Sequence, residues 1–339
     1  MIAKCVKCGK ERSGKTLSYL CHCGGIYSYS PDFKYRDGKY PERYPYLKET
    51  VSLGETVTPL LELGELSLKL EYYSPTFSYK DRGTKALISF LKGRLPSGSM
   101  INEDSSGNAG ASISAYGASA GLDVNIFVPE KTVPSKIKQI ELYGAKIHKI
   151  SGSREDVSIA ARSADGYFAS HVYNPEFRDG MREISYEIFH QVQKLPDFIF
   201  IPVSAGTLLL GVISGFQHLL DSGEIPSMPK FVAVQTEAVM PLCARMNHLQ
   251  FDPKANVQSI ADALVSREPP LLDLMLGAMQ ENGACITVSE EEIIHARQEL
   301  ASAGILVEYS SATVYAAQKK FRGNGKKLLI MSGNGLKNL

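Results

Sequence analysis

The chain has 339 residues, 44% of them hydrophobic and 22% charged, which is enough to bury a large core and more than one lobe. Lysine and arginine number 37 against 36 aspartates and glutamates, a balance that excludes the basic surface typical of proteins binding nucleic acid or membranes. No segment reads as a signal peptide or as an apolar span, so we expect a cytoplasmic protein.

Four of the six cysteines fall within the first 23 residues, in "CVKCGK" and "CHCGG". Such spacing indicates a tetrahedral structural zinc site and argues against a disulfide framework. Residues 1–30 are too few to fold around an apolar core alone, so we predict that zinc stabilises a small zinc-ribbon-like module there. Metal-free reduced cysteines, or His22 as a substitute ligand, are the alternatives. The predicted ligands are Cys5, Cys8, Cys21 and Cys23.

Residues 31–57 carry proline, glycine, tyrosine and charge without helical or strand periodicity, and they predict an extended linker. Farther along, strand-like and helix-like runs alternate, which predicts an α/β protein with mainly parallel, twisted sheets flanked by helices. The expected strands cover residues 67–73, 99–104, 123–130, 145–150, 198–204, 230–237 and 326–333. The expected helices cover residues 84–94, 108–121, 134–144, 180–192, 206–220 and 289–304.

The motif "SPTFSYKDRG" places Lys80 just before an expected helix. A lysine there adds a cation to the positive end of the helix dipole, where an anion would be favoured. This local inconsistency calls for an explanation other than propensity. A solvated surface lysine is the alternative.

Two loops rich in small and hydroxyl residues lead from expected strands into expected helices. In "EDSSGNAGASISAYG" and in "IPVSAGTLLLG", several backbone N–H groups at a helix start suit a carboxylate or a phosphate. The second loop, with Ser204, Ala205, Gly206 and Thr207, suits a phosphate better. An ordinary capped helix is the alternative for each loop. A glycine-rich stretch, "MSGNGLKNL", ends the sequence.

Taken together, "SPTFSYKDRG", "SSGNAG", "PVSAGTLLLG" and "SGNGLK" resemble the motifs of fold-type II pyridoxal-phosphate enzymes, the tryptophan synthase β family. The resemblance runs from about residue 50 to the end. The lysine motif looks like the threonine synthase form, and the cysteine-rich start is similar to that of many archaeal and bacterial threonine synthases. The resemblance implies a large cofactor-binding lobe, from 58–85 and 175–339, and a small lobe, 86–174.

The resemblance also implies roles for individual residues. Lys80 would form the Schiff base with pyridoxal 5'-phosphate, which explains its position, and Asn108 would hydrogen-bond the phenolic oxygen of the cofactor. Ser332 would face the pyridine nitrogen, where a hydroxyl favours elimination or replacement over transamination. The cofactor phosphate would be bound by Ser204, Ala205, Gly206 and Thr207. The substrate carboxylate would be bound by Ser105, Ser106 and Gly107.

The implied activity is that of a threonine synthase, a lyase that converts O-phosphohomoserine and water to threonine and phosphate. One departure affects the substrate: Phe177 stands where the family carries an arginine, and Arg178 and Arg182 are the nearby candidates for the substrate phosphate. A threonine or serine dehydratase, or a cysteate synthase-like β-replacement on a phosphorylated amino acid, is the alternative reaction.

Two readings outside enzymology also stay open. The chain could be an inactive, cofactor-binding regulator, or its zinc ribbon could bind a partner protein with the α/β body as scaffold. The expected partners are a small-molecule amino-acid substrate and a second copy in a homodimer, with neither nucleic acid nor membrane.

Overall fold

The computed structural model of the chain describes residues 1–13, 17–38, 40–132, 134–255, 257–281 and 283–338. The chain folds into two compact units, each assembled from separate segments. Unit 1 comprises Met1–Glu55 and Lys80–Met181, and unit 2 comprises Thr56–Tyr79 and Arg182–Leu339. The domain boundaries expected from the sequence stay a prediction.

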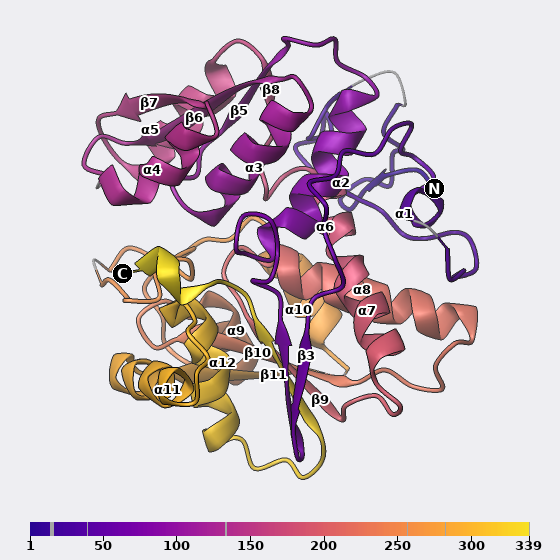
Figure 1. The fold of residues 1–339 in the computed structure, drawn as a ribbon, viewed down its shortest axis with the longest axis vertical. Helices are drawn as coiled ribbons and strands as arrows, with labels where there is room; N and C mark the ends of the chain where they lie inside the picture. Colours follow the sequence, from indigo (N-terminus) through magenta and orange to yellow (C-terminus); the bar gives the residue numbers. More distant parts are fainter. Residues whose placement is uncertain (14–16, 39, 133, 256, 282, 339) are drawn as a thin grey trace. The chain divides into compact units, whose positions relative to one another are not determined.

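Unit 1 is built around a four-stranded sheet in the order β7-β6-β5-β8, in which every neighbouring pair is parallel. Helices α3 and α5 pack against β6 (Figure 1). The strands are β5 (Met100–Glu103), β6 (Asp123–Pro129), β7 (Lys146–Ile150) and β8 (Tyr167–Phe168), with the two-residue β1 (Lys4–Cys5) and β2 (Tyr27–Ser28) in a separate antiparallel pair. The helices are α1 (Tyr40–Arg43), α2 (Lys80–Lys92), α3 (Asn108–Ser119), α4 (Pro134–Leu142), α5 (Arg154–Ser163) and α6 (Pro175–Gly180).

Helices α2 and α6 approach each other closely because glycines face the contact. A Cβ added to Gly83 would lie 2.6 Å from the carbonyl oxygen of Phe177, and one added to Gly180 would lie 2.4 Å from the carbonyl oxygen of Arg82. Any larger residue at either position would force the helices apart. These contacts explain the glycines of "KDRG" and "RDG" and hold Phe177 against the helix that begins at Lys80.

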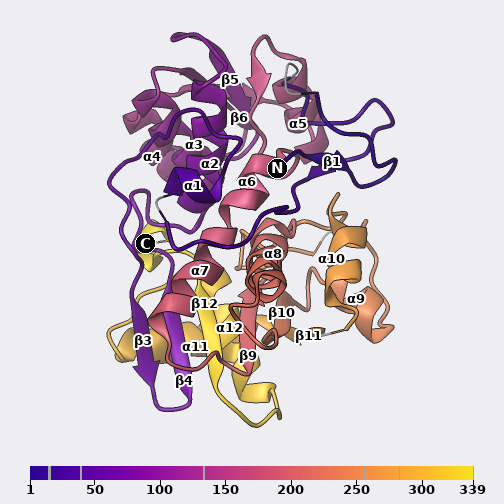
Figure 2. The same cartoon turned by 90° about the vertical axis from the view of Figure 1, so that its right-hand side faces the viewer.

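Unit 2 is built around a six-stranded sheet in the order β11-β10-β9-β12-β4-β3 (Figure 2). Every neighbouring pair is parallel except β3 with β4, which is an antiparallel hairpin. The strands are β3 (Leu60–Leu63), β4 (Leu66–Leu70), β9 (Phe198–Pro202), β10 (Lys230–Thr236), β11 (Gly283–Val288) and β12 (Lys327–Met331). The helices are α7 (Arg182–Gln191), α8 (Thr207–Ser222), α9 (Pro241–Asn247), α10 (Leu272–Met279), α11 (Glu290–Ser302), α12 (Tyr309–Lys320) and the 3-10 helix η1 (Gly335–Asn338).

The strand order of unit 2 reverses between β9 and β12. From β9 the chain moves outward to β10 and β11, and then returns to place β12 on the other side of β9. In open parallel sheets, ligands bind outside the carboxyl ends of the strands at such a reversal. The inner strands are apolar on both faces, as parallel strands covered by helices must be. Phe200, Val232 and Leu329 are paired across the sheet and buried on one face. Their chain neighbours Ile199, Phe231 and Leu328 are buried on the other face.

The N-terminal segment is attached to α6 by buried polar contacts within unit 1. Arg12 forms an ion pair with Glu176, and the Tyr29 hydroxyl donates a hydrogen bond to the same carboxylate at 2.8 Å. Arg178 donates to the carbonyl oxygen of Tyr27. Removing one member of such a buried set leaves the others without partners, so these contacts fix the cysteine-rich segment on the unit.

The predicted α/β architecture with mainly parallel strands is confirmed. All seven expected strands and all six expected helices overlap observed elements, but the helix expected at 84–94 already begins at Lys80 and the one expected at 180–192 is interrupted at Met181 between α6 and α7. The elements not predicted from the sequence are β1, β2, β3, β8, β11, α1, α5, α9, α10, α12 and η1. Of these, α1 lies within residues 31–57, which were expected to be extended throughout.

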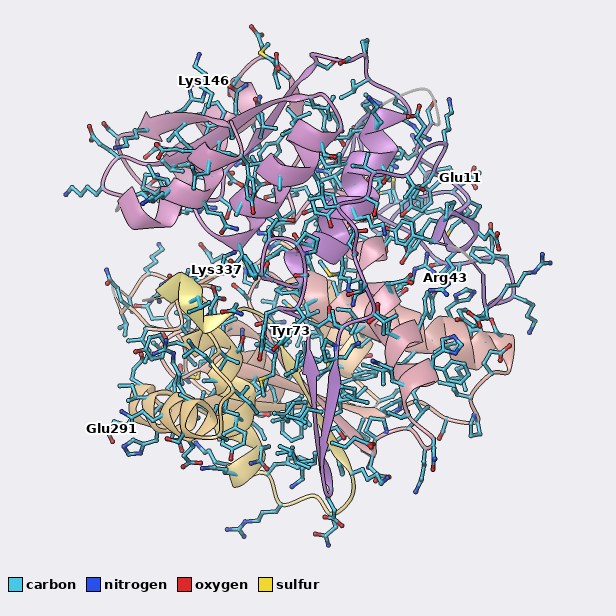
Figure 3. All side chains as sticks on the ribbon, in the orientation of Figure 1. Glu11, Arg43, Tyr73, Lys146, Glu291 and Lys337 are labelled. Atoms are coloured by element: carbon cyan, nitrogen blue, oxygen red, sulfur yellow. A yellow bond between two sulfur atoms is a disulfide. The ribbon has the colours of Figure 1, made fainter. Side chains whose placement is uncertain are left out.

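Charged side chains of both signs are exposed, among them Glu11, Lys146 and Glu291, labelled in Figure 3. This mixture agrees with the nearly balanced charge of the sequence. Within the described ranges, no helix has both the length and the apolar character needed to cross a membrane.

Candidate functional site

The loop predicted to bind phosphate lies in unit 2, directly after β9. Gly206 has φ of +95° and is the N-cap of α8, whose first residue is Thr207. An added Cβ at Gly206 would lie 2.5 Å from the sulfur of the buried Met275, so both the backbone conformation and the packing require glycine there. The Ser204 hydroxyl accepts a hydrogen bond from the backbone N–H of Ser266 at 3.3 Å. The loop thus presents the start of a 16-residue helix, a position that favours an anion.

Ser332 follows β12, the strand beside β9, so it leaves the same edge of the sheet as the phosphate-type loop. It is 5% exposed, and its hydroxyl lies 3.0 Å from the hydroxyl of Ser311 on α12. The Ser311 hydroxyl also accepts from the backbone N–H of Gly333 at 2.8 Å. Unit 2 therefore brings two predicted cofactor-binding elements to the point where its strand order reverses.

The segment that leads to Lys80 is held against the end of β12. The backbone N–H of Tyr79 donates to the carbonyl oxygen of Ser332 at 2.9 Å, and that of Asn334 donates to the carbonyl oxygen of Phe77 at 3.1 Å. Phe77 has φ of +65°, a conformation that costs about 1–3 kcal/mol for a residue other than glycine. Backbone strain of this kind persists where neighbouring contacts enforce it, and here it lies three residues before the candidate lysine.

Lys80 begins α2 in unit 1. Its Nζ lies 5.7 Å from the centre of the Phe177 ring, and the next residue, Asp81, accepts a 2.6 Å hydrogen bond from the hydroxyl of Ser112 on α3. This bond links the helix of Lys80 to the helix that begins at Asn108. Unit 1 therefore brings together Lys80 and the helix predicted to contact the cofactor ring.

The loop predicted to bind the substrate carboxylate comprises Ser105, Ser106 and Gly107, between β5 and α3. Gly107 is the N-cap of α3, and no side chain caps the helix there. Its backbone N–H donates to the Ser105 hydroxyl at 3.3 Å. A helix start without a side-chain cap is available to an external carboxylate, which is the function predicted for this loop.

A buried glutamate and a histidine lie beside this loop, and neither was predicted from the sequence to be a site residue. Nδ1 of His171 is 2.7 Å from Oε1 of Glu103, and the backbone N–H of His171 donates to Oε2 of the same carboxylate at 3.1 Å. Burial raises the pKa of Glu103 to about 7, and burial together with the charge of Lys80 holds the pKa of His171 well below its usual range. One cue was present in the sequence: Glu103 directly precedes "DSSGNAG".

Both arginines considered for the substrate phosphate have partners within their own unit. Arg178 donates to the carbonyl oxygen of Val172 at 2.8 Å and to that of Tyr27, and burial lowers its pKa to about 10. Arg182 is fully buried in unit 2, where it donates to the hydroxyl of Tyr186. These contacts account for both side chains structurally, so their part in a phosphate site stays a prediction.

The four N-terminal cysteines converge in unit 1. The sulfur atoms of Cys5 and Cys23 are 3.5 Å apart, those of Cys8 and Cys21 are 3.7 Å apart, and all four lie within 4.8 Å of one another. Tetrahedral zinc with bonds of about 2.3 Å requires sulfur separations of about 3.8 Å. The cluster therefore fits the predicted metal.

The other two cysteines form a disulfide, which was not predicted from the sequence. Cys243 on α9 and Cys285 on β11 are joined, with Cα atoms 5.1 Å apart. The bond closes a loop that contains Ser266 and Met275, the two residues that contact the phosphate-type loop. The disulfide thus bounds the segment packed on that loop.

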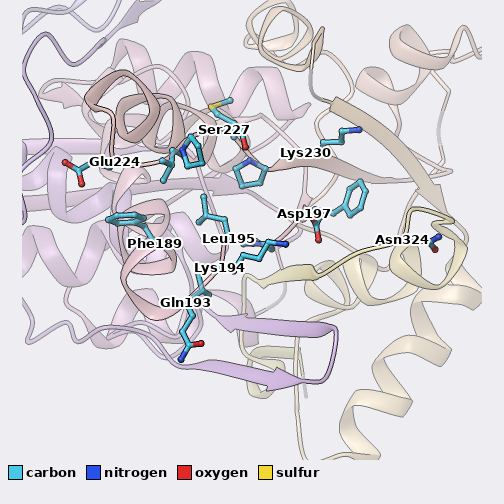
Figure 4. A pocket seen from close by; sticks show the side chains of 16 residues that line it. Phe189, Gln193, Lys194, Leu195, Asp197, Glu224, Ser227, Lys230 and Asn324 are labelled. Carbon is cyan, nitrogen blue, oxygen red and sulfur yellow. The ribbon is translucent and has the colours of Figure 1, made fainter.

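A hollow of about 640 Å³ lies elsewhere in unit 2, beside the first residues of β9 and β10. Figure 4 shows its lining, which includes Phe189, Lys194 and Asp197. The candidate residues follow the carboxyl ends of the strands, whereas this hollow lies at the amino ends, so it is separate from them.

Residues 51–333 match the model of the pyridoxal-phosphate dependent enzyme family. The chain belongs to this family. Within it, this pyridoxal-phosphate dependent enzyme is threonine synthase-like: it is 30% identical to the threonine synthase of Methanocaldococcus jannaschii, over 99% of this chain and 93% of the relative. It is also 30% identical to the threonine synthase of Methanosarcina acetivorans, over 94% of this chain and 86% of the relative.

The fold of this pyridoxal-phosphate dependent enzyme is also found in solved structures. The serine racemase from Dictyostelium discoideum superposes with a TM-score of 0.69 at 25% identity, covering 83% of this chain and 92% of the racemase. The fold-type II architecture inferred from the sequence motifs is thereby confirmed, as is the family resemblance.

Proposed function

We propose that this enzyme is a threonine synthase, which converts O-phosphohomoserine and water to threonine and phosphate. The observation that carries the proposal is the 30% identity to a threonine synthase over nearly the full length of both chains. The fold alone would not suffice, because racemases share it. A dehydratase, or a cysteate synthase-like replacement on a phosphorylated amino acid, is the alternative.

Several separate stretches of the chain would provide the residues that bind pyridoxal phosphate. Lys80 would bind it covalently, Asn108 its phenolic oxygen, and Ser332 its pyridine nitrogen. Its phosphate would be bound at the start of α8 by Ser204, Ala205, Gly206 and Thr207. The support for these assignments is the fit of the residues: a helix start suited to an anion, a neutral hydroxyl at the end of β12, and a lysine beside an aromatic ring.

The cofactor, when bound, stabilises negative charge at the substrate α carbon. The protein's own residues would transfer the protons and bind the substrate. Lys80 would move protons at the α and β carbons, and Ser105, Ser106 and Gly107 would hold the substrate carboxylate at the start of α3. A hydroxyl at Ser332, unlike a carboxylate, leaves the ring nitrogen unprotonated and so favours elimination and replacement.

Borohydride reduction followed by peptide mapping tests the cofactor lysine. We expect the label on Lys80 and none on Lys69, which is the matched control. Lys69 is fully buried, and its Nζ donates hydrogen bonds to Glu187 at 2.7 Å and to Gln191 at 2.8 Å, so it should not react with the cofactor. A label on Lys69 or on another lysine would refute the assignment.

Product analysis with a substrate panel tests the reaction. O-phosphohomoserine should give threonine and phosphate in equal amounts. If free serine or threonine is instead deaminated with much higher specificity, the dehydratase is correct, and if phosphoserine with sulfite is preferred, the cysteate synthase-like reaction is correct. Cofactor binding without any turnover would indicate a regulator.

For the N-terminal segment we propose a structural zinc ion bound by Cys5, Cys8, Cys21 and Cys23. The support is the compact sulfur cluster, whose separations suit tetrahedral coordination. Four protein ligands leave no open position for a substrate, so this metal would stabilise the fold and take no part in the reaction. A cytoplasmic location and a homodimer stay predictions.

A further inference from the structure

The contacts of His171 determine which of its ring nitrogens is available. Nδ1 is engaged with the Glu103 carboxylate at 2.7 Å, and the backbone N–H of His171 binds the second oxygen of that carboxylate. Among the described residues, Nε2 has no hydrogen-bond partner, and the side chain is 14% exposed. A neutral imidazole that donates from Nδ1 to a carboxylate has its lone pair on Nε2. The carboxylate holds the ring in place, and Nε2 can accept a proton from a bound molecule.

His171 and Lys80 lie around the same aromatic ring of unit 1. The His171 and Phe177 rings are in a T-shaped contact with ring centres 5.9 Å apart, and Lys80 Nζ lies 5.7 Å from the centre of the Phe177 ring. The charge of Lys80 is close enough to act on the titration of both His171 and Glu103. Two groups able to transfer protons therefore occupy one small region.

Building on the proposed function, we propose that His171 is a second acid–base residue of the reaction, positioned by Glu103. It would act on the water that attacks the substrate β carbon, whereas Lys80 acts at the α carbon. Proton removal from water by a positioned base contributes about 10²- to 10⁴-fold to a rate.

Once phosphate has left the γ carbon of O-phosphohomoserine and that carbon has gained a proton, the substrate has a double bond between its α and β carbons, to which water adds. An O–H bond of water breaks and its proton forms an N–H bond at Nε2 of His171. The water oxygen forms a bond to the β carbon, and the π electrons of the substrate double bond move to the α carbon. The ammonium group of Lys80 then gives a proton to the α carbon. His171 returns its proton to solvent as Lys80 regains one, so the protein ends unchanged.

The charged groups around Glu103 and His171 determine how the protonation of these two residues depends on pH. Asp104 and Glu103 face His171 from the end of β5, Lys80 faces it from α2, and Arg154 on α5 lies 3.7 Å from Asp104. With the Glu103 carboxyl titrating at a pKa of about 7, the pair gains a proton below that pH. A protonated Glu103 carboxyl donates to Nδ1 of the neutral imidazole, which places the imidazole proton on Nε2 and removes the open base. Threonine formation should therefore rise with pH through about 7 in the wild type and lose this limb in Glu103→Gln.

The test compares His171→Asn with His148→Asn in the loaded enzyme. His148 is a matched control because it lies in the same unit and bonds Asn125 at 3.0 Å. In His171→Asn, we expect threonine formation to fall at least about 100-fold with little change in KM. More of the unsaturated substrate should then leave as 2-oxo acid and ammonia. His148→Asn should change neither quantity.

Nuclear magnetic resonance supplies a readout that does not require turnover. In isotope-labelled protein without substrate, the Nδ1–H signal of His171 should lie far downfield, as expected for a hydrogen bond to a carboxylate, and should move in Glu103→Gln. An unmoved signal would overturn the positioning by Glu103. If His171→Asn does not fold, the pH profiles of the wild type and Glu103→Gln decide, and identical profiles would overturn the inference.

The two levels of failure are distinguishable. If the wild type makes no threonine from O-phosphohomoserine, the proposed function is wrong and this inference falls with it. If the wild type makes threonine and His171→Asn matches its rate and product ratio, only the inference is wrong. Loss of cofactor binding in His171→Asn would also overturn it, because the residue would then hold the cofactor.

Discussion

Substitution of Gly206 by alanine tests whether the loop before α8 binds the cofactor phosphate. Gly206 and Gly223 cap the two ends of the same helix, with φ of +95° and +81°. Alanine at either position carries the strain of a left-handed backbone, roughly 1–2 kcal/mol. An added Cβ at Gly223 would meet no atom within 4 Å, whereas at Gly206 it would lie 2.5 Å from the sulfur of Met275. Gly223→Ala is therefore a control for strain alone.

The two variants should differ in stability because only the alanine at position 206 is packed against Met275. Met275 is fully buried, so its side chain cannot move aside freely, and overpacking of this kind costs about 1–3 kcal/mol. We expect Gly206→Ala to lower the free energy of unfolding by about 2–5 kcal/mol and Gly223→Ala by about 1–2 kcal/mol. Guanidinium titrations of both variants and the wild type, without cofactor, measure this.

Cofactor titration then separates stability from function. If the loop donates backbone N–H groups to the phosphate, displacement of the loop should cost about 1.5–3 kcal/mol, a loss of roughly 10- to 100-fold in affinity. Gly223→Ala should bind pyridoxal phosphate like the wild type. Equal affinities for Gly206→Ala and Gly223→Ala would refute the assignment, even if their stabilities differ as expected.

Three further outcomes are expected. The wild type, prepared under reducing, chelator-free conditions, should contain one zinc ion that Cys5→Ser loses, and a zinc-free wild type would disprove the metal site. Replacing both Cys243 and Cys285 by alanine should lower the free energy of unfolding by about 4 kcal/mol, because the bond spans 42 residues, and a loss below about 1 kcal/mol in a denaturant titration would contradict this. Arg178→Ala and Arg182→Ala should each raise KM for O-phosphohomoserine by roughly 10- to 100-fold if they bind its phosphate, and unchanged KM values would limit them to the structural contacts observed.

Local patterns in the sequence predicted the types of element and the chemistry of the motifs. Small residues at a strand-to-helix turn indicated an anion-binding helix start at 204–207, and the structure places Gly206 there with a positive φ. Cysteine spacing predicted the sulfur cluster. Both signals lie within a short stretch of chain, residues 204–207 for the loop and 5–23 for the cysteines, where propensity and spacing are informative.

The contacts that relate distant segments could not be predicted in this way. The hydrogen bond between Glu103 and His171 joins residues 68 positions apart, and the disulfide joins residues 42 apart. The arrangement of β12 beside β9, which brings Ser332 to the edge of the sheet where Ser204 lies, depends on how the chain returns after β11. Packing and the burial of polar groups over the whole unit determine which strands are neighbours and which buried charges pair. The residues next to Glu103, His171 or Ser332 in the sequence do not indicate which distant segment will provide the partner.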